Sequence, residues 1–177
     1  MNHIMIDIET WGTTPGCMLR SIGAVEFDPE TGELGGTFYA NIDEVSQAAL
    51  GMTKDPSTIA WWADQSPEAQ AALVDDQHPL TEVLQGFASW FNHVGGQYVW
   101  GHGASFDPVL VEAAYNACML DAPWSFWNVR CCRTVLALAN RRPDRRSDDV
   151  HHNALHDAQA QARAVAAAFR TGIFKPD

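Results

Sequence analysis

Two acidic residues, Asp7 and Glu9, stand inside the apolar stretch HIMIDIETWG at residues 3–12. Three isoleucines alternate with them, which predicts a β-strand, although Asp is uncommon in strands and Glu is somewhat depleted there. Because side chains alternate between the two faces of a strand, Asp7 and Glu9 must project to the same side. Two carboxylates on one covered face repel each other and lose hydration, so the pair predicts a bound cation.

Two further stretches carry related chemistry. WGHGASFDP at 100–108 follows an apolar run and contains Asp107, and HHNALHDAQAQA at 151–162 places histidines and Asp157 at the start of an alanine-rich helix. Hard divalent cations such as Mg²⁺ and Mn²⁺ prefer oxygen ligands, and four carboxylates without cysteine suit them better than zinc. Two such ions can clamp a phosphodiester, and a neighbouring histidine can take the proton of the attacking water.

Most of these residues also have a simpler interpretation. Asp107 precedes Pro108 and could serve only as a helix N-cap. Asp157 could lie on a solvated helix face. The histidines at the start of that helix could be exposed polar residues: His151, His152 and His156. The acidic pair on the first strand resists such an interpretation, because a first strand in a mixed sheet is usually covered and a covered carboxylate pair needs a cation.

The surrounding sequence predicts the elements that would position these groups. Strands are expected at about 3–9, 19–27, 36–41 and 97–100. N-cap and proline signals, together with apolar residues at helical spacing, predict helices from Asp55-Pro56, from Ser66-Pro67, from about Leu80, from Asp107-Pro108 and over 154–170. Successive strands followed by alternating helices and strands predict one α/β domain over 1–177, in which an antiparallel meander and parallel strands form a mixed sheet flanked by helices.

Composition narrows the possible classes of protein. No run approaches the ~18 apolar residues of a membrane span, and the first residues lack a basic, apolar leader, so we expect a cytoplasmic protein with reduced cysteines. The net charge is −11, but it is uneven: residues 1–129 contain two basic and seventeen acidic side chains, whereas residues 130–177 contain nine basic and five acidic ones. A nucleic acid would therefore be contacted locally, by a metal at one end and an arginine patch at the other.

The order of the motifs resembles that of the DEDDh exonucleases, which have an RNase H-like fold. The matching pieces are Asp7-x-Glu9, Phe106-Asp107 after a strand, and His152 with four residues between it and Asp157. The resemblance extends from residue 4 to about 168. It implies that Asp7, Glu9, Asp107 and Asp157 hold two metal ions, Mg²⁺ or Mn²⁺. It also implies that His152, selected over its neighbours by the spacing, is the general base.

A narrower similarity links MTKDPSTIAWWADQSPEA, VWGHGASFD and PWSFWNVRCCRT to a small phage and bacterial branch of these enzymes. That branch includes a DexA-type exodeoxyribonuclease and a mycobacterial-type exoribonuclease. It commonly has Asn where this chain has His102, so we expect His102 to alter affinity or pH dependence, or to compete with His152 as a titrating group. The resemblance implies a 3′–5′ exonuclease that acts on single-stranded ends or 3′ overhangs and releases 5′-monophosphates. RNA is favoured over DNA, and a homodimer is expected because relatives are often dimers.

Several aromatic residues are candidate contacts with the nucleic acid. The resemblance implies that the segment after D-x-E lies against the terminal nucleotide, so backbone amides at Trp11 and Gly12 could meet the sugar and the indole could stack on a base. The alternative is that Trp11 belongs to the core. Trp61 and Trp62 are neighbours on a helix and project about 100° apart, so one is expected in the core and the other against a base.

The arginine run RRPDRRSDD at 141–149 is either a solvated turn or a loop that steers phosphates through Arg145 and Arg146. Its position beside His152 favours the second interpretation, whereas Arg130 and Arg133 could pair with acidic neighbours. Two other classes of function stay open: a catalytically silent nucleic-acid-binding module of the same fold, and a metal phosphatase that acts on free nucleotides. The presence of all five site residues argues against the first.

Overall fold

The computed structural model describes residues 1–147 and 152–172. Its centre is a six-stranded sheet with the order β4-β3-β2-β1-β5-β6. The strands are β1 (His3–Thr10), β2 (Leu19–Phe27), β3 (Leu34–Ile42), β4 (Gln77–His78), β5 (Tyr98–Gly101) and β6 (Val129–Cys131). β1, β2 and β3 pair in antiparallel fashion, and β5 joins β1 in parallel. The predicted meander and the mixed sheet are therefore confirmed.

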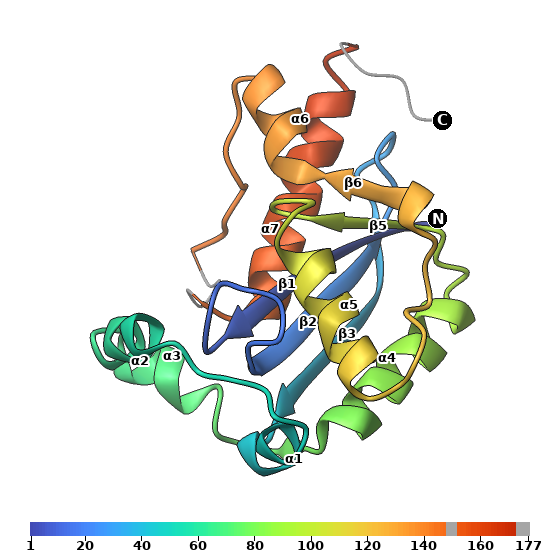
Figure 1. Cartoon of the computed structure of the whole chain (residues 1–177). Helices are drawn as coiled ribbons and strands as arrows, with labels where there is room; N and C mark the ends of the chain where they lie inside the picture. Colours follow the sequence, from blue (N-terminus) through green and yellow to red (C-terminus); the bar gives the residue numbers. More distant parts are fainter. Residues whose placement is uncertain (148–151, 173–177) are drawn as a thin grey trace.

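Helices cover both faces of this sheet (Figure 1). They are α1 (Glu44–Ala49), α2 (Pro56–Ala63), α3 (Pro67–Ala71), α4 (Leu80–His93), α5 (Asp107–Ala117), α6 (Cys132–Leu138) and α7 (Ala154–Phe169), with a short 3-10 helix η1 (Phe126–Asn128). The predicted starts of α2 and α3 are confirmed, because the side chains of Asp55 and Ser66 accept hydrogen bonds from backbone amides of the first turn. In the described part of the chain, none of the helices combines the length and the apolar character that a bilayer span needs.

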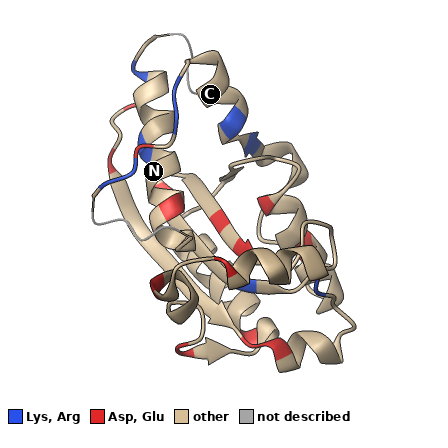
Figure 2. Cartoon of the chain, turned by 90° about the vertical axis from the view of Figure 1, so that its left-hand side faces the viewer, with Lys and Arg blue, Asp and Glu red and all other residues tan. Residues whose placement is uncertain are grey.

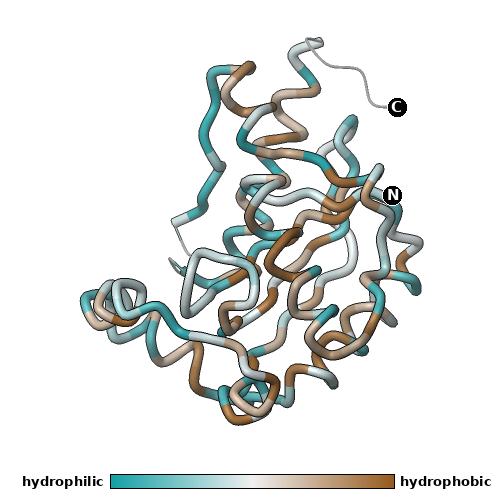
Figure 3. Tube along the Cα trace, viewed as in Figure 1, coloured by the Kyte–Doolittle hydropathy of each residue, from teal (hydrophilic) through white to brown (hydrophobic). Residues whose placement is uncertain are grey.

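Strand β1 has two different faces. Ile4, Ile6 and Ile8 belong to the larger hydrophobic cluster, which includes residues of α4 and α5. Met5 projects the other way and packs in a second cluster with residues of α6 and α7. Figure 3 shows the hydrophobic residues concentrated where the helices meet the strands. Asp7 and Glu9 continue the face of Met5, so both carboxylates point toward α7.

Helix α7 approaches the sheet unusually closely because small residues meet at the contact. Most of its alanines are buried. Gly23 of β2 faces its first turn, and a β-carbon at Gly23 would lie only 2.2 Å from the carbonyl carbon of Ala154. A glycine is therefore needed here for the start of α7 to lie over β2. The same contact brings Asp157, one turn further along α7, near the carboxylates of β1.

Candidate active site

The structure brings the five expected site residues together. Asp7 and Glu9 from β1, Asp107 at the start of α5, and His152 and Asp157 at the start of α7 all line one cavity of about 210 Å³. Parallel pairing of β5 with β1 places the beginning of α5 beside the end of β1. Three segments far apart in the sequence therefore contribute to a single polar cavity.

Asp107 reaches this cavity because the end of β5 leaves room for it. A β-carbon at Gly101 would lie 2.8 Å from Oδ2 of Asp107 and 2.7 Å from Cδ of Pro108, so only glycine permits this approach. Helix α5 has no side-chain cap, so the interpretation of Asp107 as an N-cap is wrong. Asp107 is only 3% exposed, and its Oδ2 is buried without a hydrogen-bond partner in the described part of the chain.

Three of the carboxyl groups have strongly raised pKa values. Burial, followed by the charges of Asp107, Glu9 and Asp157, raises the pKa of Asp7 well above its usual value. Burial and the charge of Asp157 raise the pKa of Glu9 to about 8, and burial raises the pKa of Asp107 to about 7. Without a cation, this cavity therefore favours protonated carboxyl groups.

His152 lies at the mouth of the same cavity. Ligand atoms of Glu9, His152 and Asp157 all lie within 4.8 Å of one another. The His152 ring meets that of Trp61 edge to face, with centroids 4.9 Å apart. Its backbone has φ 58°, a left-handed conformation that bends the chain just before α7. His156 does not line the cavity, and His151 lies outside the described residues.

Two residues of the site were missed by the sequence analysis. Gln161, one turn after Asp157 on α7, donates a hydrogen bond of 2.7 Å from Nε2 to Oδ1 of Asp7. The sequence could have indicated Gln161, because it follows Asp157 by four residues and residues at this spacing share a helix face. The guanidinium of Arg20 on β2 is buried, and its charge acts to lower the pKa of Glu9. Gln161 therefore orients Asp7, and Arg20 offsets part of the negative charge.

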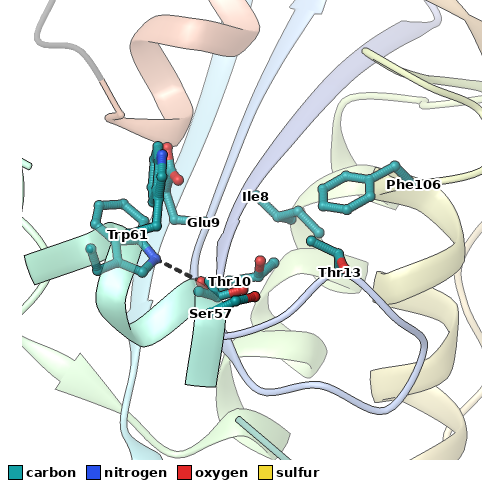
Figure 4. Close-up of a pocket in the computed structure, with 9 residues that line it drawn as sticks. Ile8, Glu9, Thr10, Thr13, Ser57, Trp61 and Phe106 are labelled. Carbon is teal, nitrogen blue, oxygen red and sulfur yellow. Dashed lines mark hydrogen bonds between the residues drawn. The ribbon is translucent and has the colours of Figure 1, made fainter. Parts of the chain in front are cut away.

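A second, more apolar cavity of about 540 Å³ adjoins the first and shares Ile8, Glu9 and Phe106 with it. Figure 4 shows Trp61 and Ser57 of α2 on one side, Phe106 on the other, and the end of β1 between them. Trp61 is 45% exposed, whereas Trp62 is 3% exposed and donates its indole N–H to the Thr10 carbonyl at 2.8 Å. One tryptophan is thus buried and the other is accessible, as the sequence predicted. We refer to this cavity as the aromatic pocket.

Trp11 and Gly12 are not among the residues that line the two cavities. The backbone N–H of Trp11 donates to Met18, and its carbonyl accepts from Asp55. Its indole ring packs against Arg20, whose guanidinium carbon is 4.1 Å from the ring centroid. The amide and one ring face of Trp11 thus have partners within the protein, and the expected contacts of Trp11 and Gly12 with a nucleotide stay predictions. The threonines of the same segment, Thr10 and Thr13, line the aromatic pocket instead.

The other expected substrate contacts differ in their surroundings. His102 lines the carboxylate cavity, and burial together with the charge of Arg133 lowers its pKa. Arg145 donates to Oδ1 of Asp157 and is thereby engaged with the site itself. Arg146, the next residue in the chain, is exposed.

The residues of the carboxylate cavity fit a divalent cation. Its acidic donor set consists of oxygen atoms, and the imidazoles of His102 and His152 also line the cavity. The buried, unpartnered Oδ2 of Asp107 and the raised pKa values both indicate negative charge that the described protein groups do not fully compensate. Hard cations such as Mg²⁺ and Mn²⁺ would supply that compensation.

A mixed sheet of this order, with acidic residues of β1, α5 and α7 meeting in one cavity, is the RNase H-like arrangement that the sequence motifs predicted. Two solved structures share the fold. Exonuclease X in complex with 5′ overhanging duplex DNA matches with a TM-score of 0.60 and 16% identity, over 98% of this chain and 94% of that one. The nuclease domain of 3′hExo, a DEDDh family member bound to rAMP, matches with a TM-score of 0.61 and 16% identity, over 96% and 92%.

The sequence comparisons then identify the family. Residues 2–169 match the 3′-5′ exoribonuclease Rv2179c-like domain, and the chain belongs to this family. The exodeoxyribonuclease of Enterobacteria phage T4 is 26% identical over 165 residues, which cover 76% of this chain and 70% of that protein. The chain is therefore an enzyme with 3′–5′ exonuclease activity on nucleic acid.

Proposed function

We propose that this enzyme removes nucleotides one at a time from the 3′ end of single-stranded RNA, or of a 3′ overhang, and releases 5′-monophosphates. The observation that carries the proposal is the direct connection between the carboxylate cavity and the aromatic pocket. A scissile phosphate bound in the first would leave the terminal nucleoside in the second. In this reaction the attacking water would displace the 3′ oxygen of the upstream nucleotide, so that the terminal nucleotide keeps the phosphate, whereas a nucleotide phosphatase would displace the nucleoside itself.

In this proposal Asp7, Glu9, Asp107 and Asp157 hold two Mg²⁺ or Mn²⁺ ions. When bound, the ions would activate the attacking water and stabilise the leaving oxygen. Gln161 keeps Asp7 oriented through its hydrogen bond to Oδ1. Burial of the carboxyl groups excludes competing water, and Arg20 limits the electrostatic cost at Glu9.

His152 is the proposed general base. It lies close enough to Glu9 and Asp157 to take a proton from a water placed between them and the phosphate. The left-handed backbone at His152 turns its imidazole over the cavity, and the edge of Trp61 limits how far the ring can rotate. Trp61 and Phe106 would in turn contact the terminal base.

RNA is proposed as the preferred substrate because the matched family is described as exoribonucleases. DNA is the second candidate, since the phage T4 relative is an exodeoxyribonuclease. One time course decides between them: RNA and DNA oligonucleotides of matched sequence, each with Mg²⁺, with Mn²⁺ and with chelator. A nucleoside monophosphate in the same series tests the phosphatase alternative. Faster degradation of DNA, or hydrolysis of the monophosphate alone, would contradict the proposal.

Three further expectations from the sequence stay predictions: a single domain over 1–177, a cytoplasmic location and a homodimer. The proposed roles of His102, Arg145 and Arg146 in substrate binding also stay predictions. For Arg145, binding to a phosphate would require it to leave Asp157, with which it pairs in this structure.

A further inference from the structure

A third cavity, of about 370 Å³, continues from the carboxylate cavity along α6. Three arginines, Arg133, Arg141 and Arg142, line it together with His102 and Asn140, and we call it the arginine pocket. His102 and Arg133 line the carboxylate cavity as well, so the two cavities are adjacent. A β-carbon at Gly103 would lie 3.3 Å from a guanidinium nitrogen of Arg133, which places this arginine against the loop between β5 and α5.

The wall of the arginine pocket is held in position by backbone hydrogen bonds. After α6 the chain reverses through Asn140, which has φ 50°, and the Arg141 amide donates to the Leu136 carbonyl at 2.8 Å. Further along, the Asp144 amide donates to the Ala160 carbonyl of α7 at 3.0 Å. Arg163 of α7 donates twice to the Asp144 carbonyl, at 3.0 and 2.8 Å. This segment is therefore docked on α7, and Arg141 and Arg142 are presented from a defined backbone.

The arginines of the pocket form no ion pair with an acidic side chain in the part of the chain that the structure describes. The nearby Arg145, by contrast, pairs with Asp157. Figure 2 shows basic residues gathered on α6 and the segment that follows it, while acidic residues dominate the strands and helices below. That segment is also hydrophilic along its length (Figure 3). Arg133 acts electrostatically on Asp107 in the adjoining cavity, but Arg141 and Arg142 form no ion pair among the described residues. In a chain of net charge −11, arginines gathered at one pocket in this way indicate an external anion.

The three cavities adjoin one another in sequence, with the carboxylate cavity in the middle. The aromatic pocket shares Glu9 with the carboxylate cavity, and the carboxylate cavity shares Arg133 with the arginine pocket. Once a scissile phosphate occupies the middle cavity and the terminal nucleoside occupies the aromatic pocket, the rest of the chain leaves on the side of the arginines. Guanidinium groups suit phosphodiester oxygens in charge and geometry.

We propose that the arginine pocket binds the phosphodiester backbone of the nucleotides upstream of the scissile bond, through Arg133 next to the reacting phosphate and Arg141 and Arg142 farther along. This inference rests on the proposed function, because the direction of the strand follows from it. It makes the enzyme sensitive to substrate length, since a dinucleotide ends before it reaches Arg141 and Arg142, whereas an octanucleotide passes them. The contacts are with phosphates, so they do not depend on base sequence.

The test compares the double variant Arg141→Ala/Arg142→Ala with the control Arg130→Ala/Arg170→Ala, which removes the same two charges elsewhere. Binding of a fluorescent single-stranded octanucleotide and of a dinucleotide is measured by anisotropy in chelator at several salt concentrations, and kcat/KM is measured separately with metal. We expect the first variant to bind the octanucleotide on the order of 10-fold more weakly, with a salt slope smaller by about 1.4, because each phosphate contact on a single strand contributes about 0.7.

The affinity of Arg141→Ala/Arg142→Ala for the dinucleotide should fall much less. The control variant should bind both oligonucleotides as tightly as the wild type does. An equal loss for both lengths, an equal loss in the control, or no loss at all would overturn the proposal. The binding readout separates it from the proposed function. If the wild type binds the octanucleotide but cleaves none, the proposed function fails, while weaker octanucleotide binding by Arg141→Ala/Arg142→Ala alone would still support the arginine pocket. Thermal unfolding of both variants confirms that they are folded.

Discussion

Replacing Asp7 by Asn should stabilise the metal-free protein at alkaline pH while removing its activity. Asp7 is the carboxyl group on which the charges of Asp107, Glu9 and Asp157 all act, and burial raises its pKa further. An asparagine has nearly the same shape as a protonated aspartic acid, and its Oδ1 can still accept the hydrogen bond from Gln161. The variant therefore keeps the packing of the site but loses one ligand for a cation.

The magnitude follows from the raised pKa values. Burial and the charge of Asp157 raise the pKa of Glu9 from 4.5 to about 8. A carboxyl group with a raised pKa stabilises the fold below its unfolded value and loses that contribution as the pH rises through the folded value. For Glu9 the loss between pH 4.5 and 8 is on the order of 5 kcal/mol, at about 1.4 kcal/mol per pKa unit. The pKa of Asp7 is raised in the same direction, by burial first and then by three neighbouring charges, so Asp7 also costs stability as the pH rises and Asn does not. We take about 1–2 kcal/mol as the order of the part that comes from those charges.

For a chain of this size, about 1–2 kcal/mol corresponds to a rise in Tm of roughly 2–8 °C. The assay is thermal unfolding of wild type and Asp7→Asn at pH 5 and pH 8.5, in chelator and in Mg²⁺. The readout is the difference between the two proteins, because histidines also titrate in this range. Mg²⁺ at a concentration of 100 times its Kd should stabilise the wild type by about 2.7 kcal/mol and so raise its Tm. It should raise the Tm of the variant much less.

The exposed Asp121→Asn is the matched control, because it makes the same chemical change away from the site. The reasoning is refuted if Asp7→Asn is no more stable than the wild type at pH 8.5 in chelator. It is equally refuted if the variant hydrolyses oligonucleotides at a rate near that of the wild type, since Asp7 would then not be a metal ligand.

Three other substitutions test the remaining parts of the site. His152→Asn tolerates the left-handed backbone and should lower kcat by about 10²–10⁴-fold, whereas His156→Gln should stay within several-fold of wild type; the reverse order would show that His152 is not the base. Trp61→Ala should raise KM for oligonucleotides by a factor that corresponds to about 1–3 kcal/mol with little change in kcat, and an unchanged KM would exclude stacking. Gly23→Ala should destabilise the fold by about 1–3 kcal/mol and lower kcat, because its β-carbon would press on the backbone of α7; wild-type unfolding and activity would contradict the close contact.

The carboxylate side of the site was predictable because it rests on local periodicity. Alternation along β1 puts Asp7 and Glu9 on one face whatever the tertiary structure is, and the proline after Asp107 marks the start of α5 directly. The arginine pocket was not predictable in this way. Its wall depends on the hydrogen bond between Asp144 and Ala160, which is a tertiary contact without a sequence signature.

Short elements were missed for a related reason. Strands β4 and β6 contain two and three residues, too few to show any alternation, and both are edge strands defined by the neighbour with which they pair. The surroundings of Trp11 also depend on a tertiary contact. A tryptophan next to an acidic pair is a reasonable base-stacking candidate, but Arg20 from the adjacent strand occupies its ring face.

The distribution of charge accounts both for the destabilisation of the metal-free fold by the site and for the proposed selectivity of the site for chain ends. Buried carboxylates destabilise the metal-free fold, and three arginines act against this: Arg20 and Arg145 lower the pKa of Glu9, and Arg133 lowers that of Asp107. A cation that uses Oδ1 of Asp157 must compete with Arg145 for that atom, so metal binding would release a guanidinium beside the arginine pocket. Because residues 1–129 are strongly acidic, a polyanion is repelled from most of the surface and attracted only where metal and arginines adjoin. An aromatic pocket on one side of that point and arginines on the other favour a strand that ends there over one that passes through.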